Sequence, residues 1–269
     1  MEYICFFLKI TLYPVAAILL CGFVDWACQR LIIRLLGHSG YKAVVASSII
    51  GTPIHELGHA AMCLLFRHKI RKLVLWKPDR SDGVFGYVQH TYNLRSLYQR
   101  LGLLFIGIGP IFSVMAVLSL LLYFFFPATW SSHSVSVAAL VENRASVMDI
   151  ITTGMRMIPN MISEFGDGSF SFWVRIPLVL VMLSVSLHSN LSPADVKVSL
   201  QALPMYLAIT LAGTVVTALI GTAATGPVLA ALEMFSTFMM AMFTVVLTFA
   251  LVQVALAMGI RVVLDLVRK

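Results

Sequence analysis

Charged side chains are scarce in this chain of 269 residues, where they make up only 12% of the sequence. Soluble globular domains carry about 25%, and 59% of the residues here are hydrophobic, so the composition excludes an ordinary soluble globular protein. Cysteine is also rare. The four cysteines match neither zinc-ribbon spacing nor a disulfide framework, and we expect them to be structural: Cys5, Cys21, Cys28 and Cys63.

Long apolar runs divide the chain into about six segments that can each cross a bilayer, since about 20 apolar residues span its hydrocarbon core. We expect transmembrane helices near residues 3–26, 43–66, 101–126, 173–190, 203–222 and 229–259. The first run is too long for a signal-peptide core and no clean cleavage site follows it, so we expect it to remain as a span. The predicted fold class is an all-α polytopic membrane protein without a separate soluble domain.

The few charges predict an orientation rather than a nucleic-acid partner. The net charge is +7, and its densest part is the segment 67–100, with eight basic residues against Asp79 and Asp82. Because Lys and Arg gather in cytoplasmic loops, we expect this segment and both termini in the cytoplasm of a bacterial cell, with 127–172 across the membrane. Arg30, Arg34 and Lys42 fall on the outer side in this topology and argue against it.

The second apolar run contains the sequence His55-Glu56-Leu57-Gly58-His59. Two histidines four residues apart lie on the same face of a helix and can bind one Zn²⁺, and the glutamate after the first can serve as general base toward a water molecule at that ion. Ionisable residues at membrane depth are costly and usually functional. The motif therefore predicts a membrane-embedded zinc hydrolase.

Small residues recur at every fourth position of the same run, in line with the histidines. A stripe of small residues allows a second helix to approach closely within a membrane. We therefore expect the two histidines to face a helix bundle rather than lipid. The residues of this stripe are Ala43, Ser47, Gly51, His55, His59 and Cys63.

Residues 71–91 contain two short β-prone runs around Pro78, with a turn signal at Ser81-Asp82-Gly83. This pattern predicts a membrane-associated β-hairpin, whose free edge can pair with an extended substrate. A solvated cytoplasmic loop is the alternative interpretation.

A catalytic zinc ion usually takes three protein ligands and leaves a fourth position for water. Asp195 is one candidate for the third ligand, because it follows a helix break at Pro193. His188 is the rival, since imidazole also suits zinc. Asn190 is better placed as a contact to a ligand residue or to the substrate backbone.

These features together resemble the site-2 proteases, zinc metalloproteases that cut peptide bonds within membranes. The matching features, in order, are the His55-Glu56-x-x-His59 motif, the basic segment with its hairpin, Gly109-Pro110, and Asn190 through Asp195. In that family a Gly-Pro element is often followed by an asparagine, where Ser113 stands here. A late Asn-Pro-Asp-Gly type motif supplies the aspartate ligand, but Val196 and Lys197 stand here in place of the glycines.

The resemblance covers roughly residues 43–200, which we expect to be the core of one membrane-embedded domain over 1–269, with accessory spans at 1–42 and 201–269. It implies Glu56 as the catalytic base, one zinc ion on His55, His59 and Asp195, and substrate or supporting contacts at Gly109, Pro110, Ser113 and Asn190. The expected substrates are membrane-spanning proteins or peptides: membrane-anchored regulators, signal-peptide remnants or precursor peptides.

The sequence is also compatible with two other functions. A membrane zinc-binding or transport protein would need further ligands along a pathway, and the later spans offer only Glu233. The second alternative function is that of a non-catalytic relative that binds membrane segments, although the intact Glu56 argues against it.

Overall fold

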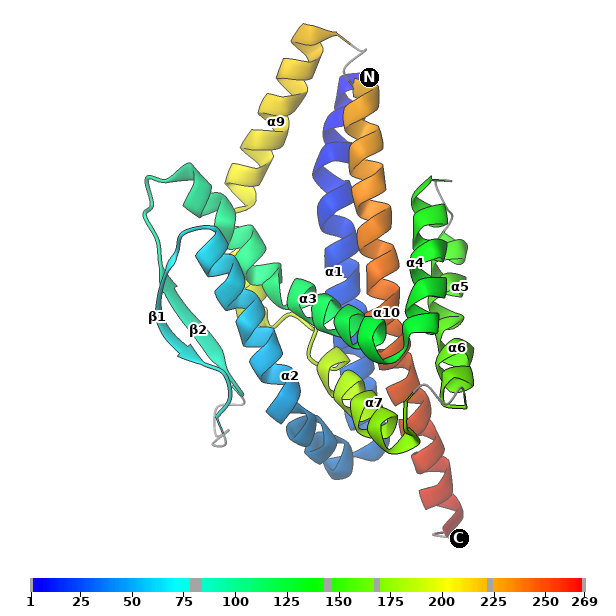
Figure 1. Cartoon of the computed structure of the whole chain (residues 1–269). Helices are drawn as coiled ribbons and strands as arrows, with labels where there is room; N and C mark the ends of the chain where they lie inside the picture. Colours follow the sequence, from blue (N-terminus) through cyan, green and yellow to red (C-terminus); the bar gives the residue numbers. More distant parts are fainter. Residues whose placement is uncertain (1, 78–83, 143–146, 167–169, 222–224, 268–269) are drawn as a thin grey trace.

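The computed structural model describes residues 2–77, 84–142, 147–166, 170–221 and 225–267, and it is mostly helical with one small sheet (Figure 1). The elements, in chain order, are α1 (Glu2–Leu36), α2 (His38–Leu65), β1 (Lys69–Val74), β2 (Tyr87–Thr91), α3 (Leu97–Phe125), α4 (Pro127–Glu142), α5 (Val147–Met155), α6 (Met157–Glu164), α7 (Phe172–Ser186), α8 (Pro193–Gln201), α9 (Leu203–Ile220) and α10 (Thr225–Val267).

Among the described residues, three helices are long and apolar enough to cross a membrane: α3, α9 and the stretch Gly226–Val267 of α10. In α1 the described stretch Tyr3–Leu12 is a shorter apolar helix, and the expected spans at 43–66 and 173–190 fall in helices that do not meet the same criteria. The span at 173–190 corresponds to α7, which has only 15 residues, and the span at 43–66 lies in α2, where polar residues interrupt the apolar run. The count of six spans therefore stays a prediction, while the predominantly helical fold is confirmed.

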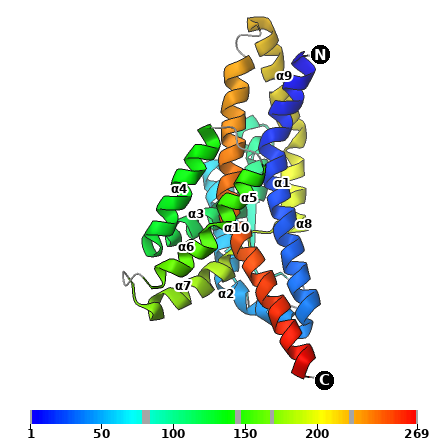
Figure 2. The ribbon, with the colours of Figure 1, turned by 90° about the vertical axis from the view of Figure 1, so that its right-hand side faces the viewer.

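The two longest helices, α1 and α10, pack along each other through the height of the molecule (Figure 1). Helices α4, α5 and α6 form a layer on one side of α10, as Figure 2 shows. The N-terminus and the C-terminus lie at opposite ends of the molecule in both views. This arrangement does not support the expectation that both termini lie on the same side of a membrane.

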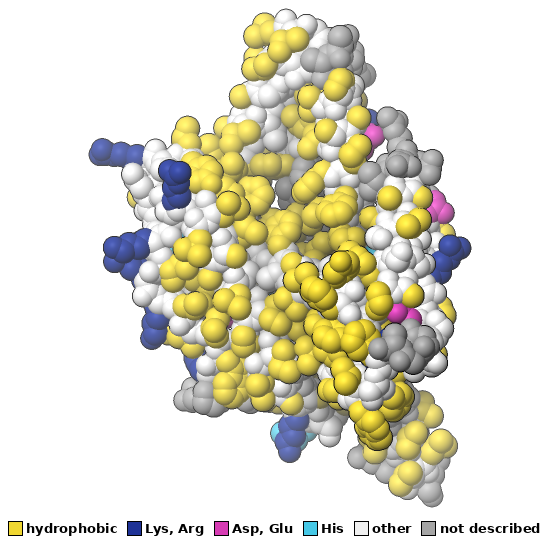
Figure 3. Space-filling model, viewed as in Figure 1, with side chains coloured by type: hydrophobic (Ala, Val, Ile, Leu, Met, Phe, Trp, Pro, Cys, Tyr) yellow, Lys and Arg dark blue, Asp and Glu magenta, His cyan; other side chains and the backbone are white. Residues whose placement is uncertain are grey.

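The predicted hairpin is confirmed in its strands. β1 and β2 pair antiparallel, with Lys69 opposite Thr91 and Val74 opposite Tyr87, and an irregularity lies between Ile70 and Lys72. The turn signal at 81–83 and Pro78 lie outside the described residues. Hydrophobic side chains dominate the face of the molecule in Figure 3, and Lys and Arg side chains gather along its edge, over the hairpin and the beginning of α3.

Helices α2 and α3 cross with their backbones in contact, because both carry glycine at the crossing. A Cβ atom on Gly58 would lie 2.6 Å from the carbonyl oxygen of Gly109, and a Cβ on Gly109 would lie 2.6 Å from that of Gly58. Ser113 locks the crossing, since its hydroxyl donates to the carbonyl of Ile54 on α2 at 2.8 Å. The small-residue stripe itself meets α7, where the Ser184 hydroxyl donates to the Ser47 carbonyl at 2.8 Å and a Cβ on Gly51 would lie 2.7 Å from the Ser184 carbonyl oxygen.

Helix α8 packs against α3 at a third glycine. A Cβ atom on Gly107 would lie 2.5 Å from the carbonyl oxygen of Asp195 and within overlap distance of the Ser199 hydroxyl oxygen. The hydroxyl of Ser199 also donates to the carbonyl of Leu104 at 3.3 Å. Glycine at position 107 therefore sets how closely the beginning of α8 approaches α3.

We predict that Gly107→Ala displaces α8 and destabilises the protein by about 1–3 kcal/mol, the usual cost of overpacking a tight site. Gly213→Ala in α9 is the matched control, because a Cβ there meets nothing within 4 Å. Thermal unfolding in detergent micelles measures both variants. Equal stability of the two would show that the contact between α3 and α8 is not tight.

Candidate metal centre

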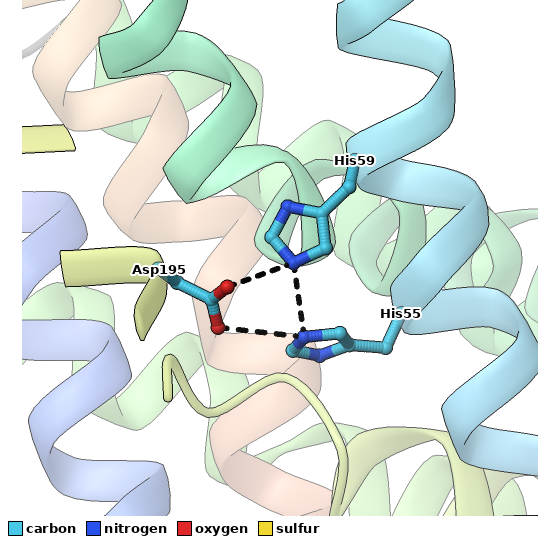
Figure 4. Close-up of side chains that lie close together, drawn as sticks. All are labelled: His55, His59 and Asp195. Atoms are coloured by element: carbon cyan, nitrogen blue, oxygen red, sulfur yellow. Dashed lines mark hydrogen bonds and ion pairs between the residues drawn. The ribbon is translucent and has the colours of Figure 1, made fainter. Parts of the chain in front are cut away.

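Three side chains from two distant parts of the chain meet inside the bundle (Figure 4). His55 and His59 come from successive turns of α2, and Asp195 comes from the first turn of α8. The Nε2 atoms of the two histidines lie 3.2 Å apart. The Asp195 carboxylate oxygens lie 3.6 Å from His55 Nε2 and 3.1 Å from His59 Nε2.

Hydrogen bonds on the far side of each ring determine which nitrogen faces the centre. His55 Nδ1 lies 2.8 Å from the carbonyl oxygen of His188, and His59 Nδ1 lies 2.6 Å from that of Ile106. A carbonyl oxygen only accepts, so both Nδ1 atoms carry the hydrogen, and in the neutral rings both Nε2 atoms are bare. Two bare nitrogens and a carboxylate at these distances repel one another unless a cation, as protons or as a metal ion, lies among them.

The carbonyl that His59 uses is free because of a proline. Residue 110 would normally donate its backbone N–H to the carbonyl of residue 106, but proline has no N–H and leaves that acceptor without its helical partner. Pro110 lies inside α3, four residues after Ile106. The Gly-Pro element therefore acts on the metal centre indirectly, by leaving a carbonyl for His59 Nδ1.

The carbonyl that His55 uses is free because a helix has ended. Helix α7 ends at Ser186, and the last carbonyls of a helix have no intrahelical partner. The carbonyl of His188, two residues further on, accepts from His55. Both histidines are thus oriented by backbone oxygens, as metal-bound histidines usually are.

Asp195 is fixed by the local sequence Ser192-Pro193-Ala194-Asp195. Ser192 caps α8: its hydroxyl accepts from the amide of Asp195 at 3.2 Å, and its own amide donates to Asp195 Oδ2 at 2.7 Å. Pro193 occupies the first turn, where its missing N–H costs nothing. This capping box holds the carboxylate, so the Pro193 break predicted from the sequence is the beginning of the helix that presents Asp195.

The spacing of the three donor atoms fits a metal ion. Bonds of about 2.0–2.2 Å at tetrahedral angles place neighbouring ligand atoms roughly 3.3–3.5 Å apart. The observed separations of 3.1, 3.2 and 3.6 Å are of that size. Among the described residues, His55, His59 and Asp195 form the group of histidine, cysteine and carboxylate side chains that can hold a metal ion.

His188, the rival candidate, contributes its backbone carbonyl rather than its ring. The imidazole packs on Gly51, where a Cβ would lie 2.4 Å from Nδ1, and that nitrogen bonds to the carbonyl of Ser184 at 3.1 Å. Asn190 donates its side-chain N–H to Gln29 on α1 at 3.1 Å. The structure thus brings Asp195, and not His188, to the two histidines.

A cavity of about 800 Å³ opens beside the three ligand residues. Glu56 lines this cavity although it is almost fully buried. Asn190 lines it too, whereas Gly109, Pro110 and Ser113 do not. Gly109 and Ser113 instead lie at the crossing of α2 and α3, and Pro110 acts through the Ile106 carbonyl.

Helix α1 also lines the cavity, through Trp26, Gln29 and Arg30, although the sequence indicated only an accessory span there. Gln29 reaches the loop after α7, where it donates to the carbonyl of Leu187 at 3.3 Å. Asp25 is buried beside Ser189 and Asn190 of the same loop. A carboxylate within the first apolar run was the sequence signal that could have pointed to this contact.

The hairpin forms another wall of the cavity, with Val84 through Val88 and His90. Gly86 comes so close to the general-base candidate that a Cβ there would lie 2.8 Å from Glu56 Cγ. His68, in the turn before β1, bonds to His90 on β2 through their Nδ1 atoms at 3.0 Å. The hairpin is therefore joined to the rest of the molecule by polar contacts on one side and covers the metal centre on the other.

Comparison of the chain with family models, with curated proteins and with solved structures finds no match. The assignment of the site therefore depends on its own geometry.

We predict that Pro110→Ala weakens metal binding by about tenfold, at the lower end of what lost supporting contacts cost. The new amide at residue 110 can bond to the Ile106 carbonyl and compete with His59 Nδ1. Pro177→Ala in α7 is the control, since the carbonyl it affects belongs to the exposed Trp173. Chelator competition with Zn²⁺ measures the affinity, and an unchanged value for Pro110→Ala would contradict the role of the free carbonyl.

We also predict that the hairpin loses stability as the pH falls. Burial, followed by the neighbouring His68 and His59, lowers the pKa of His90 to about 4, and burial lowers the pKa of His68. In the folded hairpin the pKa of each ring is thus lower than the ordinary value of about 6.5, so the unfolded hairpin takes up protons first as the pH falls. The stability contributed by the neutral pair is complete above about pH 6.5 and is lost progressively towards about pH 4.

Hydrogen exchange of the β1 and β2 amides at about pH 7.5 and about pH 5, corrected for the intrinsic rate, tests this pH dependence. The amides of α3, which contains no histidine, serve as the internal reference. Equal protection of the strands at both pH values would refute the prediction.

Proposed function

We propose that this chain is an intramembrane zinc metalloprotease similar to the site-2 proteases. The observation that carries the proposal is the metal centre itself: two bare imidazole nitrogens and a carboxylate at tetrahedral spacing, with Glu56 in the same buried cavity. A glutamate next to a ligand histidine on one helix is the arrangement of zinc hydrolases.

Zinc is the metal that these donors favour. Imidazole nitrogen suits several transition metals, but two histidines and one carboxylate in near-tetrahedral arrangement, with a position left open, are characteristic of catalytic zinc. Bound zinc would supply Lewis acidity, which polarises the scissile carbonyl and lowers the pKa of water to about 7.

The chain's own residues provide the rest of the chemistry. Glu56 accepts a proton from the attacking water and then donates it to the leaving amine, so that the peptide bond is replaced by a carboxylate and an amine. His188 and Ile106 keep the ligand imidazoles in place through their carbonyls. Asp195 is held by the capping box and adds the negative charge that the two neutral histidines lack.

The substrate we infer is an extended segment of a membrane-spanning protein or peptide. β2 pairs with β1 along one edge, and its residues and those before it line the cavity. An extended chain can add to the free edge of a strand through backbone hydrogen bonds. A helical segment cannot do so, because its N–H and C=O groups already bond to each other.

We infer that the protein crosses a bacterial cell membrane several times, with the lipid bilayer as its surroundings. The apolar α3, α9 and α10 support this setting. Because the segment 67–100 is basic, we expect the beginning of the hairpin and the beginning of α3 to lie on the cytoplasmic side of the membrane. A transporter would need further metal ligands along a path, and the described residues contain one three-ligand group.

We predict that Glu56→Gln retains the metal but lowers turnover by about 10²–10⁴-fold, the usual loss when a general base is removed. Co-expression with a panel of single-span membrane proteins, followed by analysis of the fragments, provides the activity assay. Zinc is measured in the purified protein. Asp195→Asn is the companion variant and should lose both zinc and cleavage.

Cleavage of a panel member by the wild type, abolished in both variants, would support the protease. Undiminished cleavage by Glu56→Gln would sink the proposed role of this residue. Wild-type protein that binds no zinc would contradict the metal assignment.

A further inference from the structure

A chain of hydrogen bonds runs from α3 through two histidines to the metal-site cavity. His68 Nε2 lies 2.7 Å from the carbonyl oxygen of Gln99, and His68 Nδ1 lies 3.0 Å from His90 Nδ1. The carbonyl only accepts, so His68 Nε2 carries the hydrogen. In the neutral His68 ring Nδ1 is then a bare acceptor, and the hydrogen between the two rings must belong to His90 Nδ1.

His68 has little freedom to change this arrangement. Its side chain is buried, and its ring stacks on Tyr92 with the centroids 5.0 Å apart and the planes at 17°. Gln99 is fixed as well, because its side chain donates to the carbonyl of Arg67 at 2.7 Å and accepts from the amide of Asn93 at 2.6 Å. The backbone of α3 therefore determines which His68 nitrogen carries the hydrogen, and His68 in turn determines this for His90.

His90 borders the cavity that holds Glu56 and His59. A neutral imidazole with its hydrogen on Nδ1 has a bare Nε2 on the opposite edge of the ring. That nitrogen has no hydrogen-bond partner among the described residues. The bonded pair of histidines thus leaves an acceptor, and not a donor, on the residue that lines the cavity.

We propose that His90 is a substrate-positioning residue, held by His68 in its Nδ1–H form so that Nε2 accepts a hydrogen bond from a backbone N–H of the extended substrate. This inference rests on the proposed protease function and deepens it. An extended chain beside β2 carries N–H groups that its own backbone does not satisfy, and these are the donors that a bare imidazole nitrogen binds. The lowered pKa of His90, about 4, keeps the ring neutral at physiological pH.

The first test needs no substrate. NMR spectra of the full chain, labelled with ¹⁵N-histidine in detergent micelles, show which ring nitrogens carry hydrogen. The His90 signals are assigned as those that are missing in the His90→Asn variant. We expect protonated Nδ1 and bare Nε2 on His90. In His68→Leu, which removes the acceptor, the hydrogen should shift towards Nε2.

The second test separates the two nitrogens of His90. Asparagine places an amide near the position of Nδ1 and can still donate to His68, whereas glutamine places an oxygen near the position of Nε2. The probe is the panel member that the wild type cleaves and Glu56→Gln does not. For this substrate we expect His90→Asn to raise KM about two- to tenfold with little change in kcat. This is the effect of losing one neutral hydrogen bond that holds the ground state and the transition state equally well. His90→Gln should restore much of the affinity.

The outcomes distinguish the inference from the function. A wild-type His90 with hydrogen on Nε2 overturns the inference regardless of activity. If the KM of His90→Asn equals that of the wild type, the proposed substrate contact is wrong, but the proposed protease function is unaffected. If the wild type cleaves no panel member, the proposed function fails, and the substrate contact fails with it, while the NMR result still decides whether His68 fixes the His90 tautomer.

Discussion

Two backbone carbonyls that lack a helical partner orient both histidines of the candidate metal centre. Each accepts the Nδ1–H of one ligand histidine, and so each turns a bare Nε2 towards the same point. If either carbonyl were engaged by its own helix, the corresponding imidazole could rotate or carry its hydrogen on the wrong nitrogen. The site therefore depends on two irregularities of the backbone, a proline within α3 and the end of α7, as much as on the ligand residues.

Close backbone packing brings these irregularities to the right place. Gly58 and Gly109 let α2 and α3 touch, which places the Ile106 carbonyl beside His59, and Gly107 lets α8 bring Asp195 to the same spot. Larger side chains at these positions would separate the helices by more than a hydrogen bond or a metal–ligand bond tolerates. The close contact between helix backbones thus also sets the positions of the side chains in the candidate metal centre.

The pair of histidines and the hairpin strands could be predicted from the sequence because they depend on local patterns, whereas those patterns left Asp195 and His188 as alternatives for the third position. The spacing of His55 and His59 fixes a shared helix face, and Pro193 with Ser192 marks the beginning of the helix that carries Asp195. The supporting carbonyls of Ile106 and His188 could not be predicted, since a backbone atom has no signature in the sequence. The contribution of α1 and the pairing of His68 with His90 depend on contacts between distant segments, which no periodicity reveals. The zinc ion, the protease activity and the number of spans stay predictions.

The length of α10 has a consequence for the surrounding lipid. Its 43 residues extend over roughly 65 Å at the usual helical rise, whereas the hydrocarbon core of a bilayer is about 30 Å thick. Even at a tilt of about 40°, the upper end of the observed range, the helix would cover about 50 Å along the membrane normal. If α10 crosses a bilayer, at least about two-fifths of its length therefore projects beyond the lipid tails. Exposed apolar side chains continue to its C-terminal end, at Val262, Val263 and Leu266, and a bilayer that covered them as well would have to thicken locally around the helix.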